Sequence, residues 1–324
     1  MVEVKNHTKS YGNVLAVKGI SFSANAGEIL GFLGPNGAGK TTTMNIITGF
    51  LSATGGTVTI DGYDILDNPK EARSRIGYLP EQPPLYLDMT VEKYLEFIYE
   101  LKKVKLPRQA HLKEIMTLVK IYDIKDRVIK NLSKGYRQRV GVAQALVGNP
   151  PVIILDEPTV GLDPRQIIEM RSLIRSLGKK HTVIFSSHVL SEVSAICDRI
   201  VVISNGTIAA DSKTEELSSI TDDFGRISLT VEGVPSSVAS ILSEIDSVTK
   251  VRKDIKYSEN VCSYILEHKK DTDIRRAVFR AMSKADCPIL EMKDAGKTLE
   301  ESFLYLTDVT EVERTKKGRK GGKN

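Results

Sequence analysis

The feature that most constrains this chain is a glycine-rich loop at residues 34–42, which reads GPNGAGKTT. The loop has the form G-x-x-x-x-G-K-T, follows a short apolar run at 29–33 and precedes a helix-compatible stretch at 42–49. A strand, such a loop and a helix in that order are typical of a phosphate-binding loop. Glycines let the backbone approach an anion, and the helix N-terminus adds its dipole and free N–H donors. We therefore expect an α/β fold that binds a phosphorylated ligand.

Individual residues in and near this loop can be given chemical roles. Lys40 carries a charge that can reach β- and γ-phosphates, and the hydroxyl of Thr41 can bind Mg²⁺. Upstream, Tyr11 is an aromatic side chain that could stack on a purine. The alternative is an ordinary glycine-rich turn that happens to carry Lys-Thr. The predicted nucleotide-binding residues are Tyr11, Gly34, Pro35, Asn36, Gly37, Ala38, Gly39, Lys40, Thr41 and Thr42.

The composition is that of an ordinary globular protein large enough for two domains. The 324 residues are 41% hydrophobic and 27% charged, and no stretch approaches the roughly 18 apolar residues of a membrane span. The N-terminus lacks the basic end and apolar run of a secretory signal. Three scattered cysteines suit a reducing cytosol, most simply as buried small side chains. We expect a cytoplasmic protein that acts on a membrane only from outside the bilayer.

The C-terminal end of the chain is strongly basic. The net charge is +5, and five of the last nine residues are Lys or Arg. Such a tail can contact anionic lipid or nucleic acid, or it can be a solvated end. We interpret residues 311–324 as a basic disordered tail.

Two further apolar runs end in residues with catalytic potential. The run at 152–155 is followed by Asp156 and Glu157, which is typical of a buried strand that delivers acids at its C-terminal end. Asp156 could hold Mg²⁺, and Glu157 could align and deprotonate a water molecule. The structural alternative is an acid that caps the next helix. The second run leads to His188, which we expect to contact a γ-phosphate or the attacking water.

Between these motifs lies a segment that is expected to be largely helical. Gln82 sits in a proline-rich loop after a short strand at 76–79, and its carbonyl could reach a metal ion or a water. Apolar stripes at helical spacing follow at 91–103 and 112–119, which we expect to be core. Ser133 then resembles an N-cap, with a small glycine two residues later, so this second helix start also suits phosphate.

Together these motifs resemble the ATP-binding subunit of an ABC transporter, over residues 2–211. The resemblance implies ATP and Mg²⁺ as cofactors and a P-loop NTPase (ABC ATPase) core of α/β class with an antiparallel β subdomain and a helical subdomain. It also implies that residues 34–42 form the Walker A loop and that Tyr11 stacks on adenine. Glu157 would then be the catalytic base and His188 the switch histidine. The implied magnesium ligands are Thr41, Gln82 and Asp156.

The same resemblance assigns the signature motif and the D-loop. Lys134 and Tyr136 depart from the commoner Gly and Gln of the family signature, whereas the residues that would meet phosphate are kept. Asp163 takes the D-loop position. The implied signature residues, which act in trans, are Ser133, Lys134, Gly135 and Gln138.

A finer resemblance is to the subunits of ABC-2-type exporters of the drug-export and gliding-motility kind. It is carried by the phrases at 132–139, 156–164 and 299–307. From about residue 227 the pattern predicts the order β-α-β-β-α-β, that of a small ferredoxin-like α+β domain. The predicted domains are thus 1–220, with a helical subdomain at about 85–150, then 221–310, then the tail.

The resemblance also predicts partners. One Walker A loop and one signature make only half-sites, so we expect a head-to-tail pair with a second ATP-binding subunit, most simply a homodimer. Ser133 and Gly135 of one chain would contact the γ-phosphate held by Lys40 of the other. The helical segment would pass the resulting motion to a separate integral membrane permease, with this chain peripheral on the inner face of the cell membrane. No nucleic acid partner is expected.

Two alternatives stay open on the sequence alone. A soluble ATPase acting on nucleic acid or ribosomes could use the same cassette, and the basic tail favours it. Such proteins carry two cassettes, long coiled coils or zinc cysteines, which this chain lacks. A binding module without catalysis is opposed by the intact Lys40, Asp156, Glu157 and His188. The transported substrate does not follow from the sequence, and export rests on the resemblance.

Overall fold

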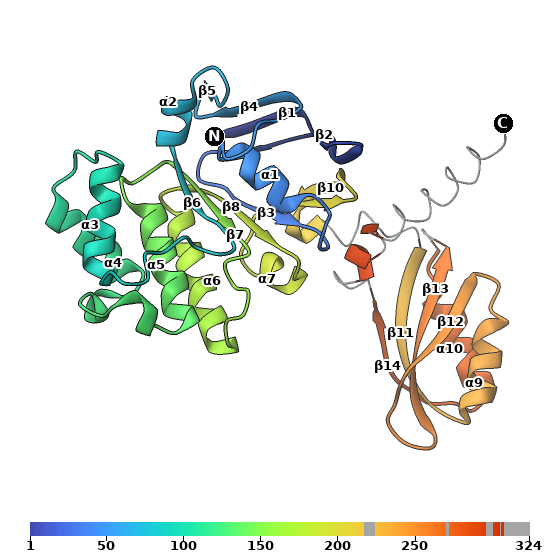
Figure 1. The fold of residues 1–324 in the computed structure, drawn as a ribbon. Coiled ribbons are helices and arrows are strands. Elements are labelled where there is room, and N and C mark those ends of the chain that lie inside the picture. Colours follow the sequence, from blue (N-terminus) through green and yellow to red (C-terminus); the bar gives the residue numbers. More distant parts are fainter. Residues whose placement is uncertain (217–223, 270–271, 296–300, 305, 308–324) are drawn as a thin grey trace, which may run out of the picture. The chain divides into compact units, whose positions relative to one another are not determined.

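The computed structural model describes residues 1–216, 224–269, 272–295, 301–304 and 306–307 (Figure 1). Two compact units are present: the first contains Met1–Thr214 and the second Glu215–Tyr305. The predicted tail at 311–324 lies outside the described residues. A closing helix is also expected at 299–306, and its described residues, 301–304 and 306, are helical. Within the described residues, no helix has the length and apolar character needed to cross a bilayer.

A six-stranded, mostly parallel sheet organises the first unit. The strand order is β10-β9-β3-β8-β7-β6, in which only β10 runs antiparallel to its neighbour. Every residue of β3, β7 and β8 is buried, which explains why these strands are apolar runs without alternation. Their carboxyl ends meet at one edge of the sheet, where α/β proteins bind ligands. The strands are β3 (Ile29–Leu33), β6 (Ile76–Leu79), β7 (Val152–Asp156), β8 (Thr182–Ser187), β9 (Arg199–Ser204) and β10 (Thr207–Lys213).

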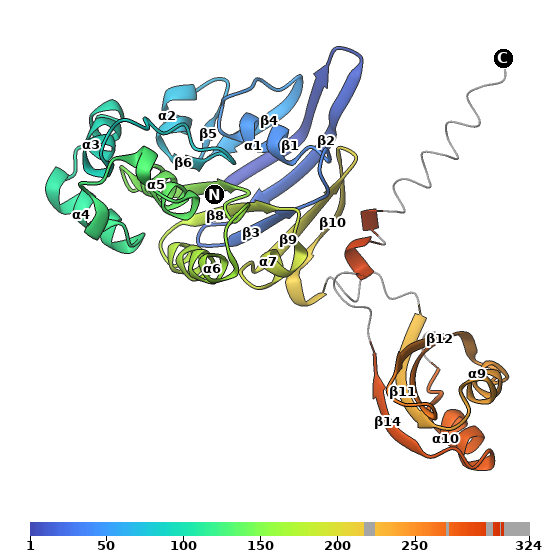
Figure 2. The same cartoon turned by 60° about the horizontal axis from the view of Figure 1, so that its bottom comes forward.

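Helices cover both faces of this sheet. Figure 2 shows α6 and α7 on one face and α1 on the other. Two helix starts have side-chain caps: the hydroxyl of Ser133 accepts from the Tyr136 N–H, and the carboxylate of Asp163 accepts from the Gln166 N–H at 2.9 Å. The helices are α1 (Lys40–Ile47), α5 (Lys134–Leu146), α6 (Pro164–Gly178) and α7 (Leu190–Ser194).

A second, antiparallel sheet lies over α1. Its order is β2-β1-β4-β5, and its apolar side chains share one core with α1 and with the parallel sheet. Val2 and Val4 from β1 and Met44 from α1 are fully or almost fully buried in this core. The antiparallel structure predicted for residues 2–28 is therefore present. The elements are β1 (Val2–Tyr11), β2 (Val14–Ala24), β4 (Gly55–Ile60), β5 (Tyr63–Asp64) and α2 (Pro69–Ser74).

The segment between β6 and β7 is helical, as predicted. The apolar stripe on α3 is buried at Val91, Tyr94, Leu95 and Ile98. Leu101 belongs to the stripe predicted at 91–103 but is 66% exposed, so the prediction that it lies in the core is wrong. Leu101 is the last residue of α3, where the chain turns away from the stripe. The elements are α3 (Val91–Leu101), α4 (Arg108–Leu118) and the short 3-10 helices at Tyr122–Ile124 and Ile129–Asn131.

The second unit is a four-stranded antiparallel sheet with two helices. Its element order is β-α-β-β-α-β and its strand order is β12-β13-β11-β14. Leu229, Tyr264 and Val278 are buried in a core between the sheet and the helices. The assignment of this unit to the ferredoxin-like class stays a prediction. The elements are β11 (Phe224–Glu232), α9 (Pro235–Ser243), β12 (Val248–Lys256), β13 (Val261–Lys269), α10 (Arg275–Lys284) and β14 (Ile289–Asp294).

We expect the folded protein to lose stability in acid because β1 carries a buried histidine. His7 is fully buried, and neither ring nitrogen has a hydrogen-bond partner in the described part of the chain. Burial, and secondarily the charge of Lys9, lowers the pKa of His7 below its ordinary value. The unfolded chain therefore binds the proton first, so stability is lost as the pH falls below the unfolded value of about 6.5, by up to about 1.4 kcal/mol per pH unit. Urea unfolding at pH 7.5 and 5.5 should show a smaller acid loss for His7→Leu than for the wild type. An equal acid loss of stability in the wild type and in His7→Leu would show that His7 is not the cause.

Candidate active site

The glycine-rich loop connects the buried strand β3 to α1. The Gly34 N–H donates to the carbonyl of Ser187 at 3.3 Å, which ties the start of the loop to the end of β8. Gly39 precedes the first residue of α1 and has φ of 107°, a backbone angle that favours glycine. No side chain caps this helix start. The free N–H groups of the first turn are therefore available to an anion.

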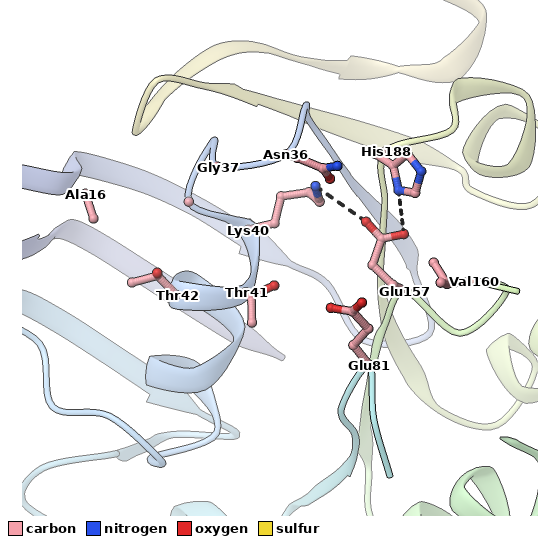
Figure 3. A pocket seen from close by; sticks show the side chains of 11 residues that line it. Ala16, Asn36, Gly37, Lys40, Thr41, Thr42, Glu81, Glu157, Val160 and His188 are labelled. Carbon is pink, nitrogen blue, oxygen red and sulfur yellow. Dashed lines mark hydrogen bonds and ion pairs between the residues drawn. The ribbon is translucent and has the colours of Figure 1, made fainter. Parts of the chain in front are cut away.

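A cavity of about 490 Å³ opens in front of this loop (Figure 3). The loop and α1 supply one wall, including Asn36, Lys40 and Thr41. The opposite wall carries Glu157 and His188 from the loops after β7 and β8. The parallel sheet thus brings together side chains that are more than 100 residues apart in the sequence.

Within the predicted loop, some residues line the cavity and others shape the loop. Asn36, Gly37, Gly39 and Thr42 line it together with Lys40 and Thr41, whereas Gly34, Pro35 and Ala38 do not. The carbonyl of Pro35 accepts from the Ala38 N–H and from the Lys40 ammonium. We infer that these three residues hold the loop in shape.

Lys40 is held by the loop that it follows. Its side chain is 6% exposed, and its ammonium donates to the carbonyls of Gly34 at 2.8 Å and Pro35 at 3.3 Å. The ammonium also lies 3.4 Å from a carboxylate oxygen of Glu157. One buried cation therefore faces both the phosphate loop and the predicted catalytic base.

Glu157 is fixed by its backbone as well as by its carboxylate. Its φ of 48° lies in the left-handed region, which costs a non-glycine residue about 1–2 kcal/mol. The backbone N–H donates to both the carbonyl and the hydroxyl of Ser186, at 3.2 and 3.0 Å. The second carboxylate oxygen lies 2.9 Å from Nδ1 of His188. The turn therefore directs the carboxylate into the cavity, where it contacts Lys40 and His188 (Figure 3).

Asp156 offers a buried oxygen that fits a divalent cation. The residue is fully buried, and Ser186 donates a hydroxyl hydrogen bond to one carboxylate oxygen. The other oxygen has no partner in the described part of the chain. Burial raises the pKa of Asp156 above its ordinary value, although the hydroxyls of Ser186 and Thr41 act in the opposite direction. A buried, unpartnered carboxylate oxygen next to the Thr41 hydroxyl is a pair of hard oxygen ligands of the kind that Mg²⁺ prefers.

The structure places Glu81, and not Gln82, beside this cavity. Glu81 lines the cavity, and its charge contributes to the raised pKa of Asp156. Gln82 is exposed and lines a neighbouring cavity of about 480 Å³ with Lys134 and Gln138. Gln82 therefore does not line the cavity in this chain, and its role as a magnesium ligand stays a prediction.

Tyr11 and the signature residues also lie away from the cavity lining. Tyr11 is 47% exposed at the end of β1, and Ala16 from β2 lines the cavity on that side. Ser133 caps its own helix, and the side chain of Gln166 lies against Gly135. A single chain therefore does not bring its signature residues to its own phosphate loop.

Asp163 and Lys134 also have contacts within the chain. Asp163 accepts a hydrogen bond at the start of α6, as described above. The side chain of Lys134 lies close to Gly161 in the turn before that helix. The signature helix and the predicted D-loop are thus neighbours in one chain.

Comparison with known proteins supports a common architecture. A family model described as ABC transporter matches residues 17–160. The chain is 34% identical over 318 residues to the uncharacterized ABC transporter ATP-binding protein YhcH of Bacillus subtilis (strain 168), covering 97% of this chain and 98% of that protein. The linearmycin resistance ATP-binding protein LnrL of the same organism is 32% identical over 318 residues, covering 96% and 99%.

Solved structures agree with the fold of the first part of the chain. A dimeric, post-hydrolysis structure of the ATP-binding cassette MJ0796 with ADP and Pi is similar at a TM-score of 0.60 and 28% identity. The match covers 66% of this chain and 99% of that one. The alignments with YhcH and LnrL thus cover nearly the whole chain, and the alignment with the solved cassette covers about two thirds of it.

Proposed function

This chain belongs to the ABC transporter ATP-binding proteins, and from that premise we propose that it drives an ABC-2-type exporter through a separate membrane subunit. The chain is an ATPase with a P-loop fold and is the ATP-binding subunit of a transporter. One observation carries the proposal for how ATP is cleaved: Glu157 faces Lys40 and His188 across a single cavity. Export is supported by the relative that is named for linearmycin resistance.

In the proposed reaction, each group acts on the nucleotide from a defined side. The loop N–H groups and Lys40 bind the β- and γ-phosphates, which neutralises charge that develops during cleavage. Glu157 orients a water molecule and accepts its proton, while His188 holds the carboxylate and contacts the γ-phosphate. Thr41 and Asp156 would hold Mg²⁺, which would add positive charge at the phosphate oxygens. The carboxylate of Glu81 lies close enough to tune this pair of ligands.

The functional unit in this proposal is a homodimer. Ser133 and Gly135 lie outside the cavity of their own chain, so a second chain would have to supply them to the γ-phosphate. The solved cassette that resembles this chain is described as dimeric, which supports the proposal. ATP would then close the pair and hydrolysis would release it, and this cycle would move the membrane subunit.

A basic groove lined by α2, β6 and the helical segment suits a membrane subunit with an acidic docking segment. The groove has a volume of about 730 Å³, and its lining includes the apolar side chains of Ile76 and Val104. No carboxylate lines it, and none of its cations forms an ion pair within the described part of the chain. These cations are Lys70, Arg73, Lys102, Lys103 and Lys105.

A contact at the groove offers a route to the signature helix. The ammonium of Lys102 donates to the carbonyls of Gln144 and Val147 at the end of α5, at 3.2 and 2.9 Å. The same helix starts at Ser133. A segment that docks in the groove could therefore shift α5 and with it the signature.

In this proposal, the chain lies on the inner face of the cell membrane, where it can contact the membrane subunit.

The test is co-purification from native membranes through a tag on the Glu157→Gln chain with ATP. We expect a multispanning membrane protein to be retained, and its recovery should fall by about tenfold or more when Lys103→Glu and Lys105→Glu are added, because charge reversal repels an acidic segment. Lys179→Glu with Lys180→Glu, which lie outside the groove, provides the matched control. Recovery of ribosomes or nucleic acid without a membrane protein would refute the transport proposal.

A further inference from the structure

A buried carboxylate behind the active site has no assigned role. Glu192 lies on α7 and is 6% exposed. Oε2 of Glu192 accepts from the hydroxyl of Thr159 at 2.5 Å and from the hydroxyl of Ser187 at 3.2 Å. Glu192 forms no ion pair within the residues that the structure describes. Hydrogen bonds from two hydroxyls therefore offset the unfavourable burial of this carboxylate.

The two hydroxyl donors belong to the loops that carry the proposed catalytic side chains. Thr159 follows Glu157 by two residues, in the turn after β7. Ser187 directly precedes His188 at the end of β8. Oε2 of Glu192 thus connects the two segments that carry Glu157 and His188, whose side chains lie 2.9 Å apart in the cavity.

Ser187 extends this connection to the phosphate loop. Its hydroxyl also accepts from the Val189 N–H at 3.0 Å, and its carbonyl accepts from the Gly34 N–H at 3.3 Å. The Ser187 hydroxyl therefore donates one hydrogen bond to Glu192 and accepts another from the Val189 N–H. The contact with Gly34 uses the Ser187 carbonyl and not the hydroxyl, so it does not require the hydrogen bond to Glu192. That hydrogen bond fixes the residue that directly precedes His188.

Helix α7, which carries Glu192, packs closely against the parallel sheet. A Cβ at Gly31 of β3 would lie 2.2 Å from the side chain of Val193, so the close packing of α7 on this strand requires glycine there. Val193 is fully buried and Leu190 is 5% exposed. The carboxylate therefore starts from a rigid position and can hold the two loops in place.

We propose that Glu192 is a positioning residue for ATP hydrolysis, which fixes the Thr159 and Ser187 loops so that Glu157 and His188 keep their mutual geometry. The inference rests on the proposed roles of Glu157 and His188. It assigns Glu192 no contact with the nucleotide. Its effect should therefore fall on the chemical step and spare ATP binding.

The hydrogen-bond pattern gives a matched pair of variants. Both hydroxyls donate to the same oxygen, so the amide oxygen of Glu192→Gln can replace it and only the charge is lost. Glu192→Leu has a similar size but no acceptor. We expect Glu192→Leu to lower kcat by about 10- to 100-fold with the KM for ATP changed less than about twofold, because small displacements of catalytic groups have effects of this size. Glu192→Gln should stay within about threefold of the wild type in kcat.

A double-mutant cycle identifies the route of the effect. Thr159→Val removes one hydroxyl at constant shape, and it should lower kcat in the same direction as Glu192→Leu. The combined variant should lose less than the product of the single losses, because both remove the same hydrogen bond. Losses that multiply fully would overturn the inference, as would wild-type kcat in Glu192→Leu or equal losses in the Gln and Leu variants.

Further variants and a binding measurement distinguish a positioning role of Glu192 from misfolding and from a wrong assignment of the catalytic base. If Glu192→Leu does not fold, Thr159→Val and Ser187→Ala remove the same contacts from the opposite side, and unchanged kcat in both would refute the inference. Binding of a fluorescent ATP analogue checks that the phosphate loop is intact. Normal turnover in Glu157→Gln would refute the proposed base itself, whatever the Glu192 variants do.

Discussion

Glu157→Gln is expected to lower ATP turnover by about 100-fold or more while ATP still binds, because an amide cannot accept the proton of the attacking water. The substitution keeps the size of the side chain and one oxygen that can contact Lys40 or His188. The left-handed turn and the two hydrogen bonds from the Glu157 N–H to Ser186 involve no side-chain atom of Glu157. The change therefore removes the proton acceptor and leaves the cavity in place.

Steady-state phosphate release and equilibrium ATP binding measure the two halves of this prediction. Size-exclusion chromatography with ATP should show the variant as a dimer that persists, because the step that releases the pair no longer occurs. Glu100→Gln, whose side chain is 66% exposed, is the control. Turnover within a few-fold of the wild type, or no dimer with ATP, would show that Glu157 is not the base.

The parts of the site that follow directly from a strand were predictable from the sequence. Asp156 and His188 end or follow apolar runs that are typical of buried strands of a parallel sheet, and the carboxyl ends of such strands share one edge. The glycine-rich loop follows a third run of the same kind. Local sequence therefore determined both the positions of these residues along their strands and their convergence in space.

Residues in irregular turns were not predictable in the same way. After β6 the chain leaves the regular strand, and nothing in the local pattern decides whether Glu81 or Gln82 faces the cavity. Tyr11 ends a long strand whose register includes several shifts, so its position relative to the loop depends on the whole antiparallel sheet. Glu192 acts across 33 residues through a hydroxyl, which leaves no periodic signal.

Lys40→Met is expected to lower ATP affinity by about 10- to 150-fold, since hydrogen bonds to a charged group contribute about 1.5–3 kcal/mol. Methionine keeps the length of an apolar stem but removes the ammonium, which contacts both the phosphate loop and Glu157. The carbonyls of Gly34 and Pro35 would lose their donor at the same time. The free energy of unfolding should also fall, because Glu157 would lose its Lys40 partner inside the protein.

The double variant Lys40→Met with Glu157→Gln separates the two effects. Removing the second charge should restore part of the lost stability, because no unpaired carboxylate then remains. It should not restore ATP affinity, because the phosphates would still lack the ammonium. Lys180→Met, at a side chain that is 75% exposed, should leave both quantities unchanged. Unchanged ATP affinity in Lys40→Met would mean that the ammonium serves only as the structural partner of Glu157, and the N–H groups of the loop would then have to bind the phosphates alone.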